Sequence, residues 1–176
     1  EGHHIRFKDT FESLICLNSI KNIQSFWFQE ETARKILKTF RGRALLADEV
    51  GLGKTIEALM VLKEYIQRSI VKSALILTPT PLVTQWKEEL KTKFGLNFPS
   101  TDDSDYHSWN QSFWKEDFIL ASINLAKSKK NFSTGHLTLL FVRIVERILP
   151  AFTFVIIFIC SAIVAAKNVR FVYHLS

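Results

Sequence analysis

The chain has 176 residues, a formal net charge of +6 at pH 7 and a hydrophobic share of 47%. This length is enough for one domain with its own core and too short for two domains of ordinary size. The hydrophobic share is that of a globular protein and excludes an intrinsically disordered chain. The positive charge suits a polyanionic partner without proving one.

The cysteines and histidines exclude a disulfide framework and a zinc site. The two cysteines, Cys16 and Cys160, lie far apart in unlike surroundings, so we expect a reducing, cytoplasmic compartment. No cluster of Cys and His has the spacing of zinc ligands. The first residues contain no signal-peptide pattern. Because residue 1 is Glu1 instead of Met, we expect a fragment or a processed piece of a longer protein.

Short apolar runs alternate with amphipathic stretches from residue 29 to about residue 130. A helix is predicted over residues 29–40, because apolar residues recur there at i, i+3, i+4 and i+7. Further helices are predicted over 55–68, over 81–94 with Thr80 as N-cap and Gly95 at its end, and after Ser122. Buried strands are predicted at 44–47, 74–77 and 118–121. Strands that alternate with helices predict an α/β fold with a parallel sheet flanked by helices.

The segment from Asp48 to Thr55 reads Asp-Glu-Val-Gly-Leu-Gly-Lys-Thr and lies between a predicted strand and a predicted helix. Glycines in such a loop let backbone N–H groups wrap a phosphate, and the helix N-terminus adds the positive end of its dipole. Lys54 would reach the β- and γ-phosphates, and the Thr55 hydroxyl would bind Mg²⁺. We therefore predict a P-loop NTPase that binds ATP and Mg²⁺, although the common P-loop has Gly at the position of Asp48.

The same eight residues closely resemble motif I of the Snf-type branch of helicase superfamily two. That family consists of ATP-driven translocases on double-stranded DNA, built from two RecA-like lobes that hold ATP and DNA between them. Phe28-Gln29 resembles the family's aromatic-Gln pair, and residues 77–79 with Gln85-Trp86 resemble motif Ia, which lies along the nucleic-acid backbone. Residues 119–123 loosely resemble the next DNA-facing motif. The resemblance covers about residues 20–130 and implies the N-terminal RecA-like lobe of a helicase-like hydrolase.

The loop chemistry and the resemblance together imply two sets of binding residues. The nucleotide set is Gln29, Gly51, Leu52, Gly53, Lys54 and Thr55, in which Gln29 contacts adenine by resemblance. The nucleic-acid set is Thr78, Pro79, Thr80, Gln85 and Ser122. Thr78 and Thr80 follow a predicted parallel strand, and ligands bind at the carboxyl ends of such strands.

Several residues also have a purely structural interpretation. Gln29 has the alternative of being an exposed polar residue at the start of a helix. Trp86, beside apolar residues on its predicted helix, is interpreted as a core residue. Glu64 and Arg68 are interpreted as part of a solvated helix face, and residues 102–105 as a solvated acidic turn within a loop over 97–116.

The second acidic motif of a working lobe is not found in the sequence. Such a lobe needs an apolar strand ending in Asp-Glu, which holds Mg²⁺ and orients the attacking water. The expected strand lies at 154–157, but Phe-Ile-Cys-Ser follows it and no Asp or Glu occurs after Glu146. The second lobe with its arginine finger is missing too. The ATP hydrolase activity is therefore assigned to the parent family, and hydrolysis by this chain alone is not expected.

The last part of the chain differs in composition from the rest. A break near 131–136 divides an ATP-binding lobe at 1–132 from an apolar tail at 133–176, in which residues 149–166 carry no charge. As a helix this run would span about 27 Å, close to the roughly 30 Å of a bilayer core. The tail is therefore a membrane helix, a set of buried strands, or the product of a frameshift or gene decay, and we favour the last. The membrane helix implies an alternative function, a membrane-tethered nucleotide-binding module without ATPase activity.

Overall fold

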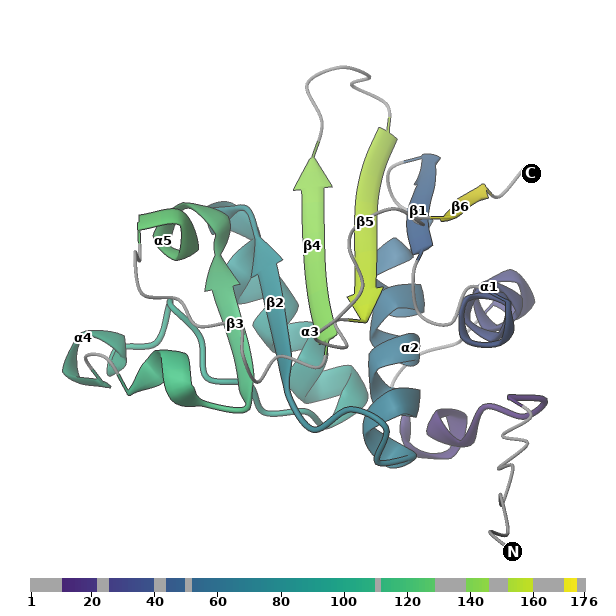
Figure 1. Cartoon of the computed structure of the whole chain (residues 1–176), viewed down its shortest axis with the longest axis horizontal. Coiled ribbons are helices and arrows are strands. Elements are labelled where there is room, and N and C mark those ends of the chain that lie inside the picture. Colours follow the sequence, from purple (N-terminus) through teal and green to yellow (C-terminus); the bar gives the residue numbers. More distant parts are fainter. Residues whose placement is uncertain are drawn as a thin grey trace, which may run out of the picture.

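The computed structural model describes residues 11–21, 26–39, 44–49, 52–109, 112–128, 139–145, 152–159 and 170–173. Its strands are β1 (Ala44–Glu49), β2 (Ala74–Thr78), β3 (Phe118–Ser122), β4 (Leu139–Val145), β5 (Phe152–Ile159) and β6 (Arg170–Tyr173). They form one sheet in the order β3-β2-β4-β5-β1-β6 (Figure 1). The helices are α1 (Trp27–Lys38), α2 (Lys54–Gln67), α3 (Val83–Phe94), α4 (Tyr106–Trp109) and α5 (Ile123–Ser128). Short 3₁₀ turns are η1 (Ile15–Ser19), η2 (Thr80–Leu82) and η3 (Phe113–Lys115).

The predicted α/β fold with a parallel sheet is confirmed. All three predicted strands are present as β1, β2 and β3, and β2 pairs in parallel with β3 so that Leu75 lies opposite Ile119. β4 is parallel to β2 on its other side. β5 departs from the expected arrangement, since it runs antiparallel to both β4 and β1.

The predicted helices are confirmed with small shifts at their ends. α3 begins two residues after the predicted start because Thr80 to Leu82 first form the tight turn η2. Gly95 ends α3 as expected, with a φ of +62° in the left-handed region that glycine adopts without steric cost. The stretch 97–116, predicted as a loop, contains the short helix α4 and the turn η3.

Three strands of the sheet come from the apolar tail. β5 contains the expected strand at 154–157 and lies between β4 and β1. Only residues 152–159 of the uncharged run 149–166 are described, and they are extended. Within the described ranges, no helix is long and apolar enough to cross a membrane. The frameshift or decay of this segment, and the boundary at residue 132, stay predictions.

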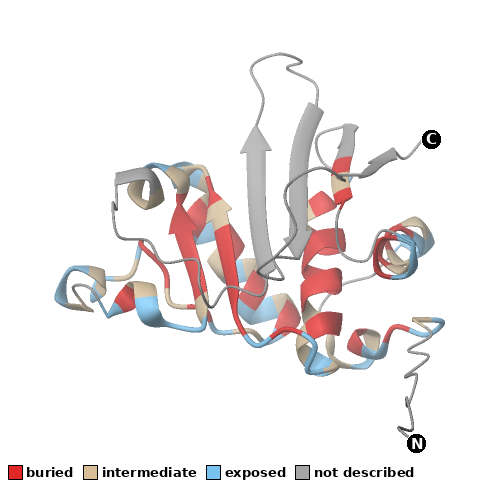
Figure 2. Ribbon diagram, in the orientation of Figure 1, coloured by how far each residue is buried: buried red, intermediate tan, exposed pale blue. Residues whose placement is uncertain are grey.

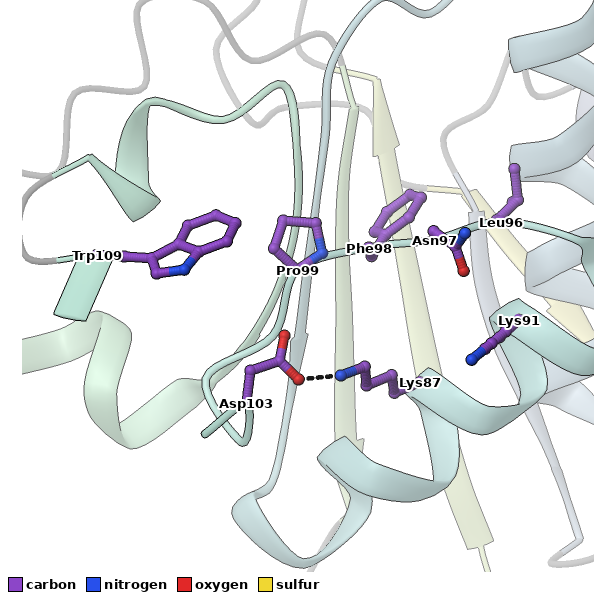
Figure 3. Close-up of a pocket in the computed structure, with 8 residues that line it drawn as sticks. All are labelled: Lys87, Lys91, Leu96, Asn97, Phe98, Pro99, Asp103 and Trp109. Atoms are coloured by element: carbon purple, nitrogen blue, oxygen red, sulfur yellow. Dashed lines mark hydrogen bonds and ion pairs between the residues drawn. The ribbon is translucent and has the colours of Figure 1, made fainter. Parts of the chain in front are cut away.

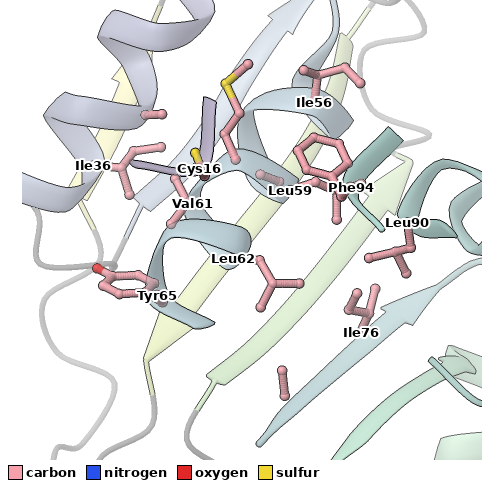
Figure 4. Packing of buried hydrophobic residues seen from close by; sticks show 14 of the residues in the cluster. Cys16, Ile36, Ile56, Leu59, Val61, Leu62, Tyr65, Ile76, Leu90 and Phe94 are labelled. Carbon is pink, nitrogen blue, oxygen red and sulfur yellow. The ribbon is translucent and has the colours of Figure 1, made fainter. Parts of the chain in front are cut away.

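The core covers both faces of the β2–β3 pair, and Figure 4 shows part of the larger cluster, which lies on one of them. On one face Ile76 of β2 and Leu120 of β3 pack with α1, α2 and α3. On the other face Leu75 and Ile119 pack with Phe113 from the stretch between α4 and β3. Trp86 of α3 is 0% exposed, which confirms its interpretation as a core residue.

α2 is the most deeply buried helix of the described chain (Figure 2). Its residues 56–62 are all buried. Because an α-helix has 3.6 residues per turn, seven consecutive buried residues mean that every side of this helix is covered. α1, η1, α3 and β5 all contact it.

Glu64 of α2 is 0% exposed, so its interpretation as part of a solvated face is wrong. Its carboxylate accepts hydrogen bonds from the backbone N–H groups of Ile15 and Cys16 at 3.2 and 2.9 Å. It also pairs with Arg68 at 2.6 Å, and Arg68 donates to the carbonyl of Ser13 at 3.0 Å. The ion pair therefore fixes the N-terminal segment 11–21 to the C-terminal half of α2.

Cys16, whose backbone N–H donates to Glu64, is buried beside this ion pair. Burial, followed by the charge of Glu64 and a hydrogen bond to it, raises the pKa of the thiol far above its usual value. The folded chain therefore keeps Cys16 protonated at pH values where the unfolded chain ionises it. Stability linked to this group is fully present below the pKa of the unfolded thiol, about 8.5, and declines as the pH rises above it.

We expect Glu64→Ala to lower the free energy of unfolding by about 3–5 kcal/mol, because it leaves a mostly buried guanidinium and two backbone N–H groups without their acceptor. Urea unfolding followed by circular dichroism measures the change. Glu31→Ala is the matched control, since Glu31 pairs with Arg34 on the surface of α1 and such pairs contribute about 0–1 kcal/mol. Equal losses in the two variants would contradict the anchoring role of Glu64.

Candidate functional site

The strand and the helix predicted on either side of the phosphate-binding residues are present. β1 ends at Glu49, and α2 begins at Lys54 with Gly53 as its N-cap residue. The carbonyl of Gly53 accepts the first helical hydrogen bond, from the N–H of Glu57 at 3.1 Å. Leu52, Gly53, Lys54 and Thr55 thus lie together at the N-terminus of α2, whereas Gly51 is outside the described residues.

Gln29 contacts this loop from a different part of the chain. Its side chain is 4% exposed, so the alternative of an exposed polar residue at a helix start is wrong. The Oε1 atom accepts a hydrogen bond from the backbone N–H of Phe26 at 3.2 Å, which caps α1. The Nε2 atom donates to the carbonyl oxygen of Leu52 at 3.4 Å. The structure therefore brings together Gln29 and the loop residues that the sequence analysis grouped as one site.

The residues at the N-terminus of α2 fit a bound phosphate. Gly53 has a φ of +82°, and a Cβ atom at this position would lie 2.1 Å from Nε2 of Gln29. Only glycine allows this close approach and this backbone conformation. The positive end of the helix dipole, the N–H groups of the first turn and the Lys54 ammonium group supply the donors that a phosphate requires.

The fit to Mg²⁺ is partial. Thr55, the second residue of α2, is half-buried and carries the hydroxyl predicted as a magnesium ligand. Among the described residues, no group of three or more His, Cys, Asp or Glu side chains could hold a metal ion. The role of Thr55 as a magnesium ligand stays a prediction.

Two aromatic side chains beside the loop were missed by the sequence analysis. Phe26 and Trp27 are 56% and 79% exposed, and the ring of Phe26 stacks on Phe28 with a centroid distance of 5.4 Å. They lie at the start of α1, next to the glutamine that contacts Leu52.

The five predicted nucleic-acid residues divide into two groups. Thr78 and Ser122 are register partners at the ends of β2 and β3, and both are buried. The Ser122 hydroxyl accepts a hydrogen bond from the N–H of Leu125 at 3.2 Å and caps α5, while the Thr78 hydroxyl is buried without a hydrogen-bond partner in the described part of the chain. Thr80 and Gln85 are exposed, and Pro79 is half-buried.

The acidic turn at 102–105 is more than a solvated turn. Asp102 accepts a hydrogen bond from the Thr84 hydroxyl at 2.8 Å, and Asp103 forms an ion pair with Lys87. Both partners belong to α3, so the turn holds this helix against the edge of the sheet. Beside the ion pair lies a pocket of about 430 Å³ (Figure 3), lined by Lys87, Lys91, Leu96, Asn97, Phe98, Pro99, Asp103 and Trp109.

Comparisons with known proteins agree with this geometry. The SNF2-related domain matches residues 28–137, which is more than half of the chain. The chain is 44% identical over 99 residues to the uncharacterized ATP-dependent helicase YqhH of Bacillus subtilis (strain 168), a match that covers 56% of this chain and 17% of that protein. It is 37% identical over 102 residues to the RNA polymerase-associated protein RapA of Proteus mirabilis (strain HI4320), covering 56% of this chain and 10% of that protein.

The chain thus spans less than a fifth of the length of these two relatives. Among solved structures, the Sulfolobus solfataricus SWI2/SNF2 ATPase core in complex with dsDNA is similar, with a TM-score of 0.51 and 22% identity over 61% of this chain and 23% of that chain. At this identity the likeness shows a shared fold. The SNF2-related match begins at the aromatic-Gln pair and includes the phosphate loop and all of α5. The chain therefore belongs to the SNF2-related domain family, within the Snf-type branch of helicase superfamily two.

Proposed function

We propose that this chain is the ATP-binding lobe, residues 1–132, of an ATP-dependent translocase on double-stranded DNA. We also propose that the chain alone binds ATP without hydrolysing it. The observation that carries the proposal is the N-terminus of α2, where Gly53 adopts a positive φ and is followed by Lys54. The named relatives support an ATP-dependent helicase as the class of parent protein.

Phosphate binding follows from the loop and from the helix behind it. Lys54 is buried, and its position at the first turn of α2 directs a positive charge to the phosphates of a bound nucleotide. α2 is covered on every side over residues 56–62, and this burial keeps the N–H groups of its first turn fixed. Magnesium, when bound with ATP, neutralises phosphate charge, and Thr55 would hold it through its hydroxyl.

The lack of hydrolysis is proposed because the sequence lacks acidic residues where the reaction requires them. Orienting a water molecule against the γ-phosphate requires a carboxylate at the end of a neighbouring strand. β5 lies next to β1, but the residues that follow it contain neither Asp nor Glu. A second lobe would have to supply the arginine finger in addition.

DNA binding is proposed at the segment that connects β2 to α3. Pro79 and Thr80 lie there, at the carboxyl end of a parallel strand, and Gln85 follows in the first turn of α3. The side chains of Thr80 and Gln85 are exposed. Hydroxyl and amide groups at this position can hold phosphates of a duplex without reading its sequence. The dsDNA in the similar Sulfolobus solfataricus complex supports this choice of partner.

We expect Lys54→Ala to weaken ATP binding about 10- to 100-fold, since it removes a charge-assisted contact to the phosphates. Titration of the full chain with a fluorescent ATP analogue measures the affinity. Lys63→Ala, on the same helix, is the control and should bind as the native chain does. An unchanged affinity in Lys54→Ala would reject the phosphate-binding assignment.

Phosphate release from ATP should be the same for the native chain and for Lys54→Ala, with or without duplex DNA. The reason is that neither the acidic motif nor the arginine finger is available to the bound nucleotide. A coupled phosphate-release assay on both proteins provides the measurement. Turnover by the native chain that Lys54→Ala abolishes would show that this chain hydrolyses ATP by itself.

We expect Thr80→Val to weaken binding to duplex DNA about fivefold, because the hydrogen bond from the hydroxyl to the DNA phosphate backbone is lost. The loss should be equal for two duplexes of unrelated sequence. Fluorescence anisotropy with labelled duplexes is the measurement. Thr92→Val is the control, since the Thr92 hydroxyl bonds within α3 to the carbonyl of Glu88. A loss confined to one duplex, or no loss at all, would contradict a backbone contact by Thr80.

A further inference from the structure

Residues 100–103, called the connecting turn below, contact the sheet and α3 at the same time. Toward the sheet, the backbone N–H of Thr101 donates to the carbonyl of Leu120 at 3.1 Å. The Thr101 hydroxyl accepts a hydrogen bond from the N–H of Ser122, also at 3.1 Å. Thr101 and Ser122 are both buried. The connecting turn is therefore attached to the carboxyl end of β3 from inside the protein.

Toward α3, the connecting turn contributes two carboxylates. The Thr84 hydroxyl donates to Asp102 at 2.8 Å, and Lys87 forms an ion pair with Asp103 (Figure 3). The Asp103 carboxylate is itself held in place, because it accepts hydrogen bonds from the N–H and the hydroxyl of Ser100 at 2.8 and 3.2 Å. Residues three apart are neighbours on a helix surface, so both carboxylates engage one side of α3.

These contacts give α3 an orientation that its apolar packing alone does not define. The buried side of the helix consists of Val83, Trp86, Leu90 and Phe94. Hydrophobic burial is non-directional, so it holds the helix on the sheet more strictly than it fixes rotation about the helix axis. Within the described ranges, the side-chain hydrogen bonds and ion pairs that leave α3 all go to the connecting turn.

We propose that Asp102 and Asp103 are positioning residues for the binding of duplex DNA. They hold the β2–α3 segment at the carboxyl end of β3 and do not touch the duplex themselves. Thr84 follows Thr80 by four residues and directly precedes Gln85, so the bond at Thr84 restrains the backbone that carries both predicted DNA contacts. This inference rests on the DNA contact proposed for that segment.

The charge of the two aspartates makes the proposal testable by the sign of an effect. A carboxylate near a duplex repels its phosphates, so its removal should tighten binding if charge is all that matters. A positioning carboxylate does the opposite, since its removal disorders the segment that binds. Loss of affinity on removal of a negative charge is therefore the signature of positioning.

The test compares two variants with the same change of charge. Asp102→Ala removes a carboxylate together with the acceptor of the Thr84 hydroxyl. Asp105→Ala, the matched control, removes a carboxylate that accepts from its exposed neighbour Ser104. Affinity for a labelled duplex is measured by fluorescence anisotropy on the full native chain and on each variant. Thr84→Val breaks the same bond from the exposed side of α3 and serves if the aspartate variant does not fold.

We expect Asp102→Ala to bind the duplex about threefold to tenfold more weakly than the native chain. Asp105→Ala should bind equally well or more tightly, because it relieves repulsion and breaks no contact to α3. Thr84→Val changes no charge and should lose as much affinity as Asp102→Ala. The double variant should lose no more than either single variant, whereas a direct contact of Thr84 with DNA would make the losses additive. Affinity for a fluorescent ATP analogue should be unchanged in all of them.

A second measurement needs no DNA. Asp103→Ala removes the acceptor that fixes Ser100 and the partner of Lys87, so it should loosen the connecting turn. Hydrogen exchange of the Ser122 amide, which donates to Thr101, should then be faster than in the native chain. Exchange at the same rate in the two proteins would contradict a turn that holds the end of β3.

The outcomes separate the inference from the function on which it rests. Tighter duplex binding by Asp102→Ala, as by Asp105→Ala, would overturn the positioning role and leave DNA binding intact. A parallel loss of affinity for the ATP analogue would assign the connecting turn to the stability of the whole fold, and would also overturn it. Failure of the native chain to bind duplex DNA would overturn the proposed DNA contact and this inference with it.

Discussion

The enclosure of α2 is the constraint on which the rest of the structure depends. Seven consecutive residues of this helix are buried, so it can neither rotate nor shift without disturbing the sheet and three other helical elements at once. At one end it carries Gly53 and Lys54. At the other end the buried Glu64–Arg68 pair ties down the N-terminal segment. A phosphate site that must present fixed N–H groups is thereby attached to the least movable part of the fold.

Gln29 connects the described end of this loop, Leu52 and Gly53, to α1. A glycine-rich loop has many conformations in the unfolded chain and loses more entropy than other segments when it is fixed. A side chain that both bonds to Leu52 and fills the space beside Gly53 restricts those conformations before a ligand arrives. The packing of the protein itself therefore requires glycine at position 53, because of its positive φ and its missing Cβ, as a bound phosphate would.

Much of the fold could be predicted from the sequence because its signals are local. Apolar runs of four residues marked β1, β2 and β3, and Pro81 with Gly95 marked the ends of the η2–α3 unit. The loop residues were found because their chemistry depends on a short contiguous stretch. Burial of polar residues could not be predicted in this way. Glu64, Gln29 and Ser122 have partners 48, 23 and 21 residues away, and no pattern within one helix or strand reports such contacts.

The same limit applies to the acidic turn and to the tail. Asp102 and Asp103 look solvated until the chain brings α3 beside them. The uncharged run 149–166 is compatible with a helix by length and with a strand by its β-branched residues, and only pairing with β4 and β1 decides in favour of β5 for residues 152–159.

The order of the strands sets the distance between the proposed nucleotide site and the proposed DNA site. β5 and β4 lie between β1, which leads into the phosphate loop, and β2, which leads to Thr80. With neighbouring strands about 4.8 Å apart, three spacings separate these exits by about 14 Å. No single side chain bridges that gap. Any coupling between the proposed nucleotide and duplex sites would therefore have to pass through packed elements, among which α2 and α3 touch each other.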